Sequence, residues 1–327
     1  MTTGCTGETA TTGSTARAAG GAGSDYIESG LGDNIFVFGR GYGHDTVKAC
    51  NGAVNKHNQV RLLGLGPDEI TIRVAERLED RWTHQDLVFE IKSTGETMTI
   101  LQGFSGGYSY RIQSVEFGDG TVWSWDDIRR SGFHGAWGDD TLALPYNEAA
   151  ALYGEGGNDF LTGSSYDDAL YGGDGDDRIY GGHGDDILDG GSGHDYLEGG
   201  YGNDIYIFRA GDGRDTINNY DGSIGDDLLR LADLEAADLW FEKSGNHLVI
   251  RLVETDDRIT VNNWYAGDYY KIGSIEAGNL ALAYDQVGQM IQALAGLGAP
   301  GAADGQWTED QREALVPIIN YYWQPRA

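Results

Sequence analysis

A nine-residue repeat runs without a break through residues 154–207. Read in blocks of nine from Gly154, it gives GEGGNDFLT, GSSYDDALY, GGDGDDRIY, GGHGDDILD, GGSGHDYLE and GGYGNDIYI. Position one is glycine, position six is aspartate, and position eight is apolar or aromatic in every block. Because the blocks stay in phase, they predict one structural unit per block and not an irregular glycine-rich tract. A matching block, GAWGDDTLA, begins at Gly135 and is separated from the array by residues 144–153.

The block predicts a parallel β-roll. Glycines at the turn allow positive φ and a close approach of backbone carbonyls. A short strand follows, with the apolar residue at position eight pointing inward and its neighbours outward. Two blocks then form one coil, so every second block stacks at about 4.8 Å. The stacked aspartates would repel each other without a cation, and calcium accepts six to eight oxygens from carboxylates and carbonyls.

The charge balance agrees with a cation-binding chain. Asp and Glu number 52 against 22 Lys and Arg, which gives a formal net charge of −30 at pH 7. This charge argues against nucleic acid or an anionic membrane as a partner, because both require basic patches. No run of 18 apolar residues is present, so the sequence predicts no membrane span.

The repeat resembles the calcium-binding nonapeptide of RTX (repeats-in-toxin) proteins. The resemblance implies that each Ca²⁺ lies between turns n and n+2. Turn n supplies the carbonyls of positions two and four, turn n+2 those of positions one and three, and each supplies its sixth-position aspartate. The implied carboxylate ligands are Asp140, Asp159, Asp168, Asp177, Asp186, Asp195 and Asp204. The implied carbonyl ligands are Gly157, Gly172, Gly173, Gly175, Gly181, Gly182, Gly184, Gly190, Gly191, Gly193 and Gly199.

Carried over to this chain, the resemblance pairs Asp159 with Asp177, Asp168 with Asp186, Asp177 with Asp195, and Asp186 with Asp204. The second block departs from the pattern, because Ser164 and Tyr166 stand where glycines are expected. That departure puts the Asp168–Asp186 site in doubt. His183 and His194 fall at turn positions three and five, where we expect bystanders and not metal ligands.

A shorter array lies near the N-terminus. It reads GGAGSDYIE from Gly20, then SGLGDNIFV, and ends with RGYGHD at residues 40–45. The long array ends with the same device, AGDGRD at residues 210–215, again offset by two residues. We therefore expect two further aspartate pairs and two further glycine ligands: Asp25 with Asp45, Asp195 with Asp215, and Gly21 and Gly23. Asn34 replaces the aspartate of the intervening block and weakens any site there.

The segments that follow the two arrays also match. DLVFEI at 86–91 parallels HLVIRL at 247–252, MTILQGF at 98–104 parallels ITVNNWY at 259–265, and YRIQSVEF at 110–117 parallels YKIGSIEA at 270–277. These alternating strands resemble the β-rich segment that follows RTX arrays in secreted bacterial proteins. The predicted class is all-β, with two tandem parallel β-roll modules, β-rich caps and a short helical C-terminal tail.

The expected organisation has five parts, of which the first is a linker. The others are a short roll with its cap, the main roll, a second β-rich cap, and the helical tail. Their boundaries are 1–19, 20–130, 131–217, 218–282 and 283–327. In the tail, Tyr284, Val287, Met290, Ile291 and Leu294 follow a helical period, and Thr308 with Gln311 forms a capping box. Pro317 is expected to kink or shorten the second helix. The tail resembles the uncleaved signals of type I secretion, and an oligomerisation or packing helix is the alternative interpretation.

No catalytic motif is present in the sequence, so we expect this chain not to be an enzyme, although an enzymatic domain upstream fits the family. The expected function is a calcium-binding module that folds on extracellular Ca²⁺ and supports export through a type I secretion channel. The alternative is a carbohydrate- or surface-binding module. Trp123, Trp125, Trp264 and Tyr269 would be its candidate glycan contacts if they are exposed, and cap packing is the other interpretation of these rings.

Overall fold

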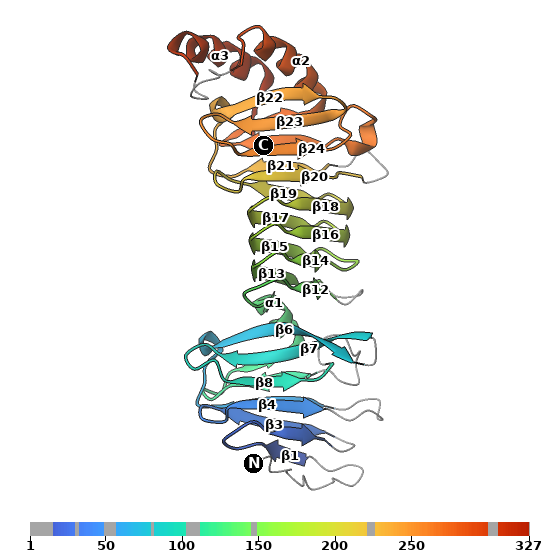
Figure 1. Cartoon of the computed structure of the whole chain (residues 1–327), viewed down its shortest axis with the longest axis vertical. Helices are drawn as coiled ribbons and strands as arrows, with labels where there is room; N and C mark the ends of the chain where they lie inside the picture. Colours follow the sequence, from blue (N-terminus) through green and yellow to red (C-terminus); the bar gives the residue numbers. More distant parts are fainter. Residues whose placement is uncertain are drawn as a thin grey trace. The chain divides into compact units, whose positions relative to one another are not determined.

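The structure is a computed structural model. It describes residues 16–29, 33–48, 57–79, 82–102, 112–144, 149–220, 226–299 and 307–326. The chain divides into two compact units, Met1–Ala136 and Trp137–Ala327. The described residues are rich in strands and contain three short α-helices, which confirms the predicted β-roll class (Figure 1).

The first unit begins as a short parallel roll. One of its sheets has the order β1-β3-β5-β9-β10, and the other has the order β2-β4-β8-β7-β6-β11. The pairs β1–β3, β3–β5 and β2–β4 are parallel, whereas β6–β7 and β7–β8 are antiparallel. The elements are β1 (Ala16–Ala19), β2 (Tyr26–Glu28), β3 (Asn34–Gly39), β4 (His44–Lys48), β5 (Asn58–Leu63), η1 (Pro67–Glu69), β6 (Ile70–Glu79), β7 (Trp82–Ile91), β8 (Thr97–Ile100), β9 (Ser114–Glu116), β10 (Val122–Ser124), α1 (Trp125–Ser131) and β11 (Phe133–His134).

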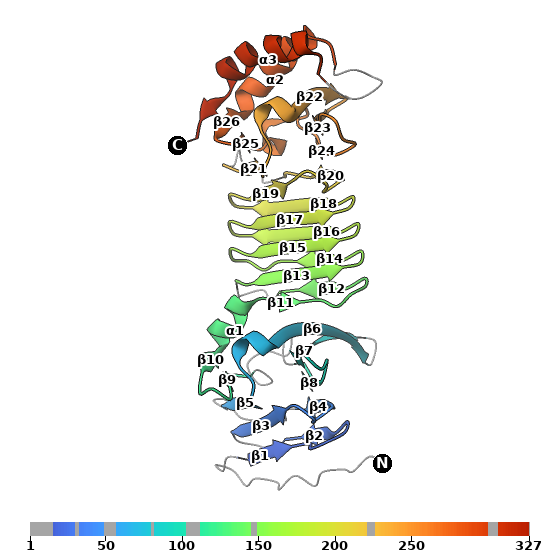
Figure 2. The same cartoon turned by 90° about the vertical axis from the view of Figure 1, so that its left-hand side faces the viewer.

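The second unit contains the main roll, whose strands alternate between two parallel sheets (Figure 2). One sheet has the order β13-β15-β17-β19-β21-β25-β26-β27, and the other has the order β12-β14-β16-β18-β20-β24-β23-β22. The roll strands are β12 (Thr141–Ala143), β13 (Ala151–Gly156), β14 (Phe160–Thr162), β15 (Ala169–Asp174), β16 (Arg178–His183), β17 (Ile187–Ser192), β18 (Tyr196–Tyr201), β19 (Ile205–Phe208) and β20 (Arg214–Ile217).

The roll is filled by the residues at position eight of each block. Leu170 pairs in register with Leu188, and Leu188 with Tyr206, so these side chains stack in one column. The opposite sheet contributes a second column through Leu161, Ile179 and Leu197. All of these side chains are at most 1% exposed, which confirms the predicted inward direction of position eight.

The cap of the second unit repeats the topology of the first. Its elements are β21 (Leu228–Leu231), η2 (Ala236–Asp238), β22 (Leu239–Ser244), β23 (His247–Leu252), β24 (Arg258–Val261), η3 (Asp268–Tyr270), β25 (Ser274–Ala277) and β26 (Leu280–Ala283). In each unit an antiparallel hairpin, β6–β7 or β22–β23, leads into a third strand that pairs parallel with the last roll strand. The match between the two caps predicted from the sequence therefore extends to strand pairing.

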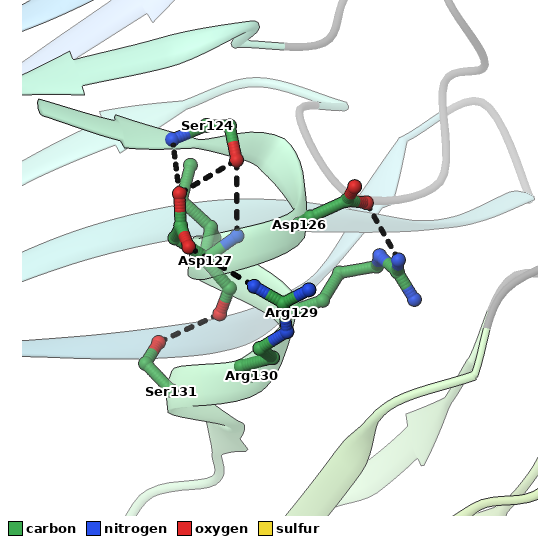
Figure 3. A network of polar contacts seen from close by, with 7 residues as sticks. Ser124, Asp126, Asp127, Arg129, Arg130 and Ser131 are labelled. Atoms are coloured by element: carbon green, nitrogen blue, oxygen red, sulfur yellow. Dashed lines mark hydrogen bonds and ion pairs between the residues drawn. The ribbon is translucent and has the colours of Figure 1, made fainter.

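Helix α1 ends the first cap and is fixed by a capping box. The backbone N–H of Asp127 donates to Oγ of Ser124 at 3.3 Å, and the backbone N–H of Ser124 donates back to Asp127 at 2.9 Å (Figure 3). Arg129 and Arg130 pair with Asp126 and Asp127 one turn earlier. The acids lie at the N-terminus and the bases at the C-terminus, which is the favourable orientation for the helix dipole.

Two helices and a short strand follow the second cap: α2 (Tyr284–Ala295), α3 (Glu309–Tyr322) and β27 (Gln324–Pro325). The side chains of Val287, Met290 and Leu294 are buried, as the helical period predicts. Thr308 and Gln311 form the predicted capping box of α3. Of the two effects expected of Pro317, shortening does not occur, because α3 continues to Tyr322, and a kink stays a prediction. Proline has no backbone N–H, so Pro317 leaves the carbonyl of Glu313 without a donor. Both residues are exposed, so water can solvate that carbonyl.

Candidate metal site

The sixth-position aspartates form two buried ladders in the second unit, one on each edge of the roll. In each ladder the backbone N–H of one aspartate donates to Oδ1 of the aspartate two blocks later. Asp159 donates to Asp177 at 2.7 Å, and Asp177 to Asp195 at 2.8 Å. The Asp159 ladder contains Asp140, Asp159, Asp177, Asp195 and Asp215. The Asp186 ladder contains Asp168, Asp186, Asp204 and Asp227.

The structure thus brings together each aspartate pair expected from the repeat. Asp168 donates to Asp186 at 2.8 Å, and Asp186 to Asp204 at 3.0 Å. The two pairs that follow a two-residue insertion also form, Asp195 with Asp215 at 3.0 Å and Asp25 with Asp45 at 3.1 Å. Their role as metal ligands stays a prediction.

The main indication of a cation site is Oδ2, the second carboxylate oxygen of the ladder aspartates. Within the described residues, several Oδ2 atoms are buried and accept no hydrogen bond: those of Asp25, Asp45, Asp159, Asp177, Asp186 and Asp195. A buried carboxylate oxygen without a donor is costly. A hard cation that prefers oxygen ligands would satisfy these atoms, so the residues present fit calcium.

Burial raises the pKa of several carboxyl groups in the ladders of the second unit. Desolvation is the largest cause, and the charge of neighbouring aspartates adds to it. The pKa of Asp159 is raised to about 6, that of Asp177 and of Asp195 to about 7, that of Asp186 to about 8, and that of Asp215 to about 9. The site therefore disfavours ionised carboxylates unless positive charge accompanies them.

The position-one glycines line the same space. A Cβ on Gly172 would overlap both Oδ2 of Asp177 and the carbonyl oxygen of Gly190. A Cβ on Gly181 would overlap the corresponding atoms of Asp186 and Gly199. Position one therefore needs glycine because a carboxylate oxygen and a carbonyl oxygen from the next turn converge there, as a shared ligand site requires.

The other predicted glycines hold the turn conformation. At positions two and four they adopt positive φ, for example 131° at Gly175. The same holds for Gly21, Gly23, Gly157, Gly173, Gly182, Gly184, Gly191 and Gly193. A Cβ on Gly175 would also overlap the carbonyl oxygen of Gly157 in the preceding turn. These positions bring the turn carbonyls close together, as the resemblance implied, and carbonyl ligation stays a prediction.

The Asp168 position differs from the others. Its Oδ2 accepts a hydrogen bond from the backbone N–H of Ser164 at 2.6 Å. Ser164 stands where the repeat has glycine, and its side chain also accepts from the N–H of Tyr166 at 3.1 Å. The Asp168 carboxylate is therefore satisfied within the turn, which gives a structural basis for the doubt attached to the Asp168–Asp186 site.

Asp227 is a ladder member that the sequence did not reveal. The N–H of Asp204 donates to its Oδ1 at 2.9 Å, and Asn219 donates to its Oδ2 at 2.8 Å. The hydroxyl of Tyr206 in turn donates to Asn219. Asp227 lies 23 residues after Asp204, so neither the 18-residue spacing nor the 20-residue spacing finds it.

In the first unit, two asparagines occupy the position that corresponds to Asp204 and Asp227 in the second unit. Nδ2 of Asn34 donates to Oδ1 of Asn58 at 3.0 Å, and both side chains are at most 2% exposed. Asn34 pairs in register with Asn58 at the start of β3 and β5. Among the described residues, this edge has an amide pair where the Asp25–Asp45 edge of the same unit has a carboxylate pair.

A second, outer ladder follows position five. The N–H of Asp176 donates to Asn158, and the N–H of Asp185 donates to Asp167, both at 2.8 Å. The N–H of His194 donates to Asp176 at 2.9 Å. Sequence reasoning missed this ladder because exposed Asp and Asn side chains do not differ in type from ordinary solvated ones. The repeated Asp-Asp and Asn-Asp dipeptides were the available signal.

The rings of His183 and His194 make contacts other than with the inner-ladder carboxylates. The ring of His183 stacks on Tyr201 with centroids 4.9 Å apart, and Nδ1 of His194 lies 2.6 Å from the carbonyl of Gly193. Among the described residues, no three His, Cys, Asp or Glu side chains gather into one metal site. A cation at the ladders therefore requires backbone carbonyls in addition to the paired carboxylates.

The four aromatic candidates for glycan contact have different environments. Trp264 is 2% exposed, so it does not meet the condition for a glycan contact, and the ring packs in the cap core, which was the other interpretation. Trp123 packs edge-on against Phe117, and Trp125 packs against Phe133. Tyr269 is 53% exposed. Packing of the cap thus accounts for the three tryptophans.

The comparisons with known proteins match the same segments. The family described as "RTX calcium-binding nonapeptide repeat (4 copies)" matches residues 13–46, 153–188 and 180–217. The family described as "Haemolysin-type calcium binding protein related domain" matches residues 86–127 and 247–276, which are the two caps. No described helix has the length and apolar character needed to cross a membrane.

The chain is also similar to two larger proteins. It is 37% identical over 79 residues to the iron-regulated protein FrpA of Neisseria meningitidis serogroup C, which is 23% of this chain and 7% of that relative. The crystal structure of extracellular lipase LipA from Serratia marcescens matches 75% of this chain and 36% of its own, at 19% identity and a TM-score of 0.29. On the family matches to its arrays and caps, the chain is an RTX calcium-binding repeat protein.

Proposed function

We propose that the chain is a module that folds when Ca²⁺ binds to the inner ladders. The buried Oδ2 atoms of the Asp159 ladder carry this proposal, because no described hydrogen-bond donor satisfies those of Asp159, Asp177 and Asp195. Ions held there would supply the positive charge that the desolvated carboxylates lack. The chain itself supplies paired carboxylates, converging carbonyls and the apolar columns that fix the turns.

The energetics support a metal-dependent fold. Residues 154–204 contain 13 acidic residues and one basic residue. Each ordered residue costs about 1–2 kcal/mol of backbone entropy, and each block buries a single position-eight side chain to offset that cost. Because the sites form only in the folded chain, the free energy of metal binding becomes free energy of folding.

The proposed location is outside the cell, where calcium modules bind at about 10⁻⁴–10⁻³ M. At the far lower calcium concentration of a cytosol, the roll would stay unfolded and suited to export through a type I secretion channel. The aligned stretch spans only 7% of the FrpA relative, so the activity of a longer protein that includes this module is a separate question. The roll itself is a structural module, and no catalytic role is assigned to it.

A calcium titration of the full chain tests the proposal. Far-ultraviolet circular dichroism should show a cooperative gain of β signal with a midpoint of about 10⁻⁴–10⁻³ M calcium. Magnesium should not replace calcium, because it demands near-ideal octahedral geometry and dehydrates reluctantly. A β signal that is already complete in chelator would overturn the proposal.

Carbohydrate binding is the alternative function. Burial of Trp264 removes one of its expected contacts, and the two other tryptophans pack against cap residues. The observation that favours it lies on the roll, where aromatic rings gather on the outer face of one sheet.

A further inference from the structure

The outer face of strands β14, β16 and β18 carries a cluster of rings around one arginine. These strands lie side by side in one sheet (Figure 2). Phe160 pairs in register with Arg178, and Arg178 with Tyr196, so these three residues are neighbours across the sheet. Leu161, Ile179 and Leu197, next to them in the chain, point into the roll. Phe160, Arg178, Tyr180 and Tyr196 are called the aromatic face below.

The rings of this face form a continuous surface. The centroids of Phe160 and Tyr180 are 5.3 Å apart, and those of Tyr180 and Tyr196 are 5.8 Å apart. Phe160 is 40% exposed. The Tyr196 hydroxyl donates to Glu198 at 2.8 Å, and Asn218 donates to the same carboxylate at 2.9 Å. These bonds hold the Tyr196 ring in place, so a ligand would meet a surface that is already ordered.

Arg178 has an unusual environment for an arginine in this chain. It is exposed, and its side chain makes no hydrogen bond or ion pair within the described residues, although it is the one basic residue of the acidic tract 154–204. Four other arginines of the second unit pair with carboxylates: Arg209 with Asp189, Arg214 with Asp256, Arg230 with Glu276, and Arg251 with Glu242. The guanidinium of Arg178 is therefore available to an external anion.

The chemistry of the face selects the ligand. Aromatic rings offer flat apolar surfaces, and a free guanidinium binds a planar carboxylate through two parallel hydrogen bonds. A sugar ring that carries a carboxylate presents both complementary groups. We propose that the aromatic face binds an acidic glycan, with the carboxylate of one sugar on Arg178 and the faces of its rings on Phe160 and Tyr180.

The acidic edges of the roll limit this site to a local contact. Exposed carboxylates at position five, such as Asp176 and Asp185, repel an anionic chain that approaches either turn. Screening confines that repulsion to about 8 Å at physiological ionic strength. A short uronic acid oligomer lying along the middle of the face keeps its contacts and avoids much of the repulsion. This inference rests on the alternative function above and not on the metal ladders, apart from its need for a folded roll.

Binding of trigalacturonate to the full chain in saturating calcium tests the proposal. A short oligomer is chosen because calcium gels long polyuronates. Calorimetry should detect binding of the acid, and at least tenfold weaker binding of its methyl ester, which lacks the charge. Arg178→Gln and Phe160→Ala should each weaken binding at least tenfold. The matched controls Arg230→Gln and Tyr171→Ala, on the other sheet, should change it less than twofold.

The same samples separate this inference from the calcium proposal, because calcium binding and circular dichroism are measured on each. A chain that folds with calcium but does not bind trigalacturonate overturns the glycan inference alone. Equal binding of acid and ester, or unchanged binding by Arg178→Gln, also overturns it. Binding of phosphatidylserine vesicles in place of the oligomer assigns the face to a membrane and overturns it as well.

Discussion

The side chain of Asn34 donates to that of Asn58 at 3.0 Å, at the place in the first unit where Asp204 and Asp227 meet in the second. The same ladder position is thus neutral in one unit and acidic in the other. A neutral amide pair needs no cation, whereas two stacked carboxylates do. The two modules therefore allow the same ladder position to be compared with and without buried negative charge.

Replacing the two asparagines at this position by aspartates should make the stability of the first unit depend on calcium. The double variant Asn34→Asp/Asn58→Asp places two buried carboxylates together, and we expect it to destabilise the first unit in chelator by about 3–5 kcal/mol. Calcium should restore most of that loss. Thermal unfolding of the full chain in chelator and in calcium measures both effects. An unchanged transition in chelator would show that the position tolerates charge without a cation.

Removal of a single ladder carboxylate should weaken calcium binding. Asp177→Asn removes a proposed ligand, whose Oδ2 is buried and accepts no hydrogen bond. We expect about ten- to hundredfold weaker binding at that site, equivalent to about 1.5–3 kcal/mol. Asp176→Asn is the matched control, because Asp176 is the adjacent exposed residue of the outer ladder. Calorimetric calcium titrations that give equal affinities for the two variants would refute the assignment of the inner ladder.

The position-one glycines should not accept a methyl group. Gly172→Ala would place its Cβ onto Oδ2 of Asp177 and the carbonyl of Gly190, so the turn must open and the calcium midpoint should rise at least tenfold. Gly288→Ala is the control, because a Cβ there meets nothing within 4 Å and alanine favours the helix α2. If both variants titrate like the unsubstituted chain, the space beside Gly172 is not a ligand site.

Acid should promote folding when calcium is absent. The folded-state pKa of Asp177 is raised to about 7 and that of Asp186 to about 8, against about 3.9 in the unfolded chain. The folded state then binds more protons between these values, so its stability in chelator rises as pH falls from 8 towards 4. The contribution is complete below the unfolded pKa and is lost as pH rises through the folded pKa. Circular dichroism in chelator at pH 5 and pH 8 measures this difference.

Calcium reverses that trend, since protons compete with the ion for the same carboxylates. The apparent calcium affinity should therefore fall as pH decreases from 8 to 5. A pH-independent affinity, together with a pH-independent β signal in chelator, would contradict the burial of ionisable groups in the ladders.

The aspartate pairs and apolar columns of the roll could be predicted from the sequence, because each block has the same turn and strand pattern as the block stacked on it. The spacing from Asp159 to Asp177 fixes the stacking, and Leu170 with Leu188 fixes the inward column. The offset pairs Asp25–Asp45 and Asp195–Asp215 were also found, since both arrays end with the same turn motif.

The irregular parts could not be predicted, because they depend on contacts between distant segments. Asp227 joins the ladder across 23 residues, and Asn219 satisfies its second oxygen. Trp264 belongs to a cap whose strand β24 pairs with β20, at positions that lie 44 residues apart in sequence. The hydrogen bond from Ser164 to Asp168 depends on the geometry of the turn. The presence of serine in place of glycine does not by itself specify that geometry.

Hydrogen exchange of the full chain tests the central claim most directly, namely that Ca²⁺ at the inner ladders is what folds the roll. The backbone amides of Asp159, Asp177 and Asp186 donate to the next aspartate in the ladder, so their protection reports ladder formation. We predict strong protection of peptides that cover residues 151–217 in millimolar calcium, and little protection in chelator at pH 8. Equal protection under the two conditions would contradict the account.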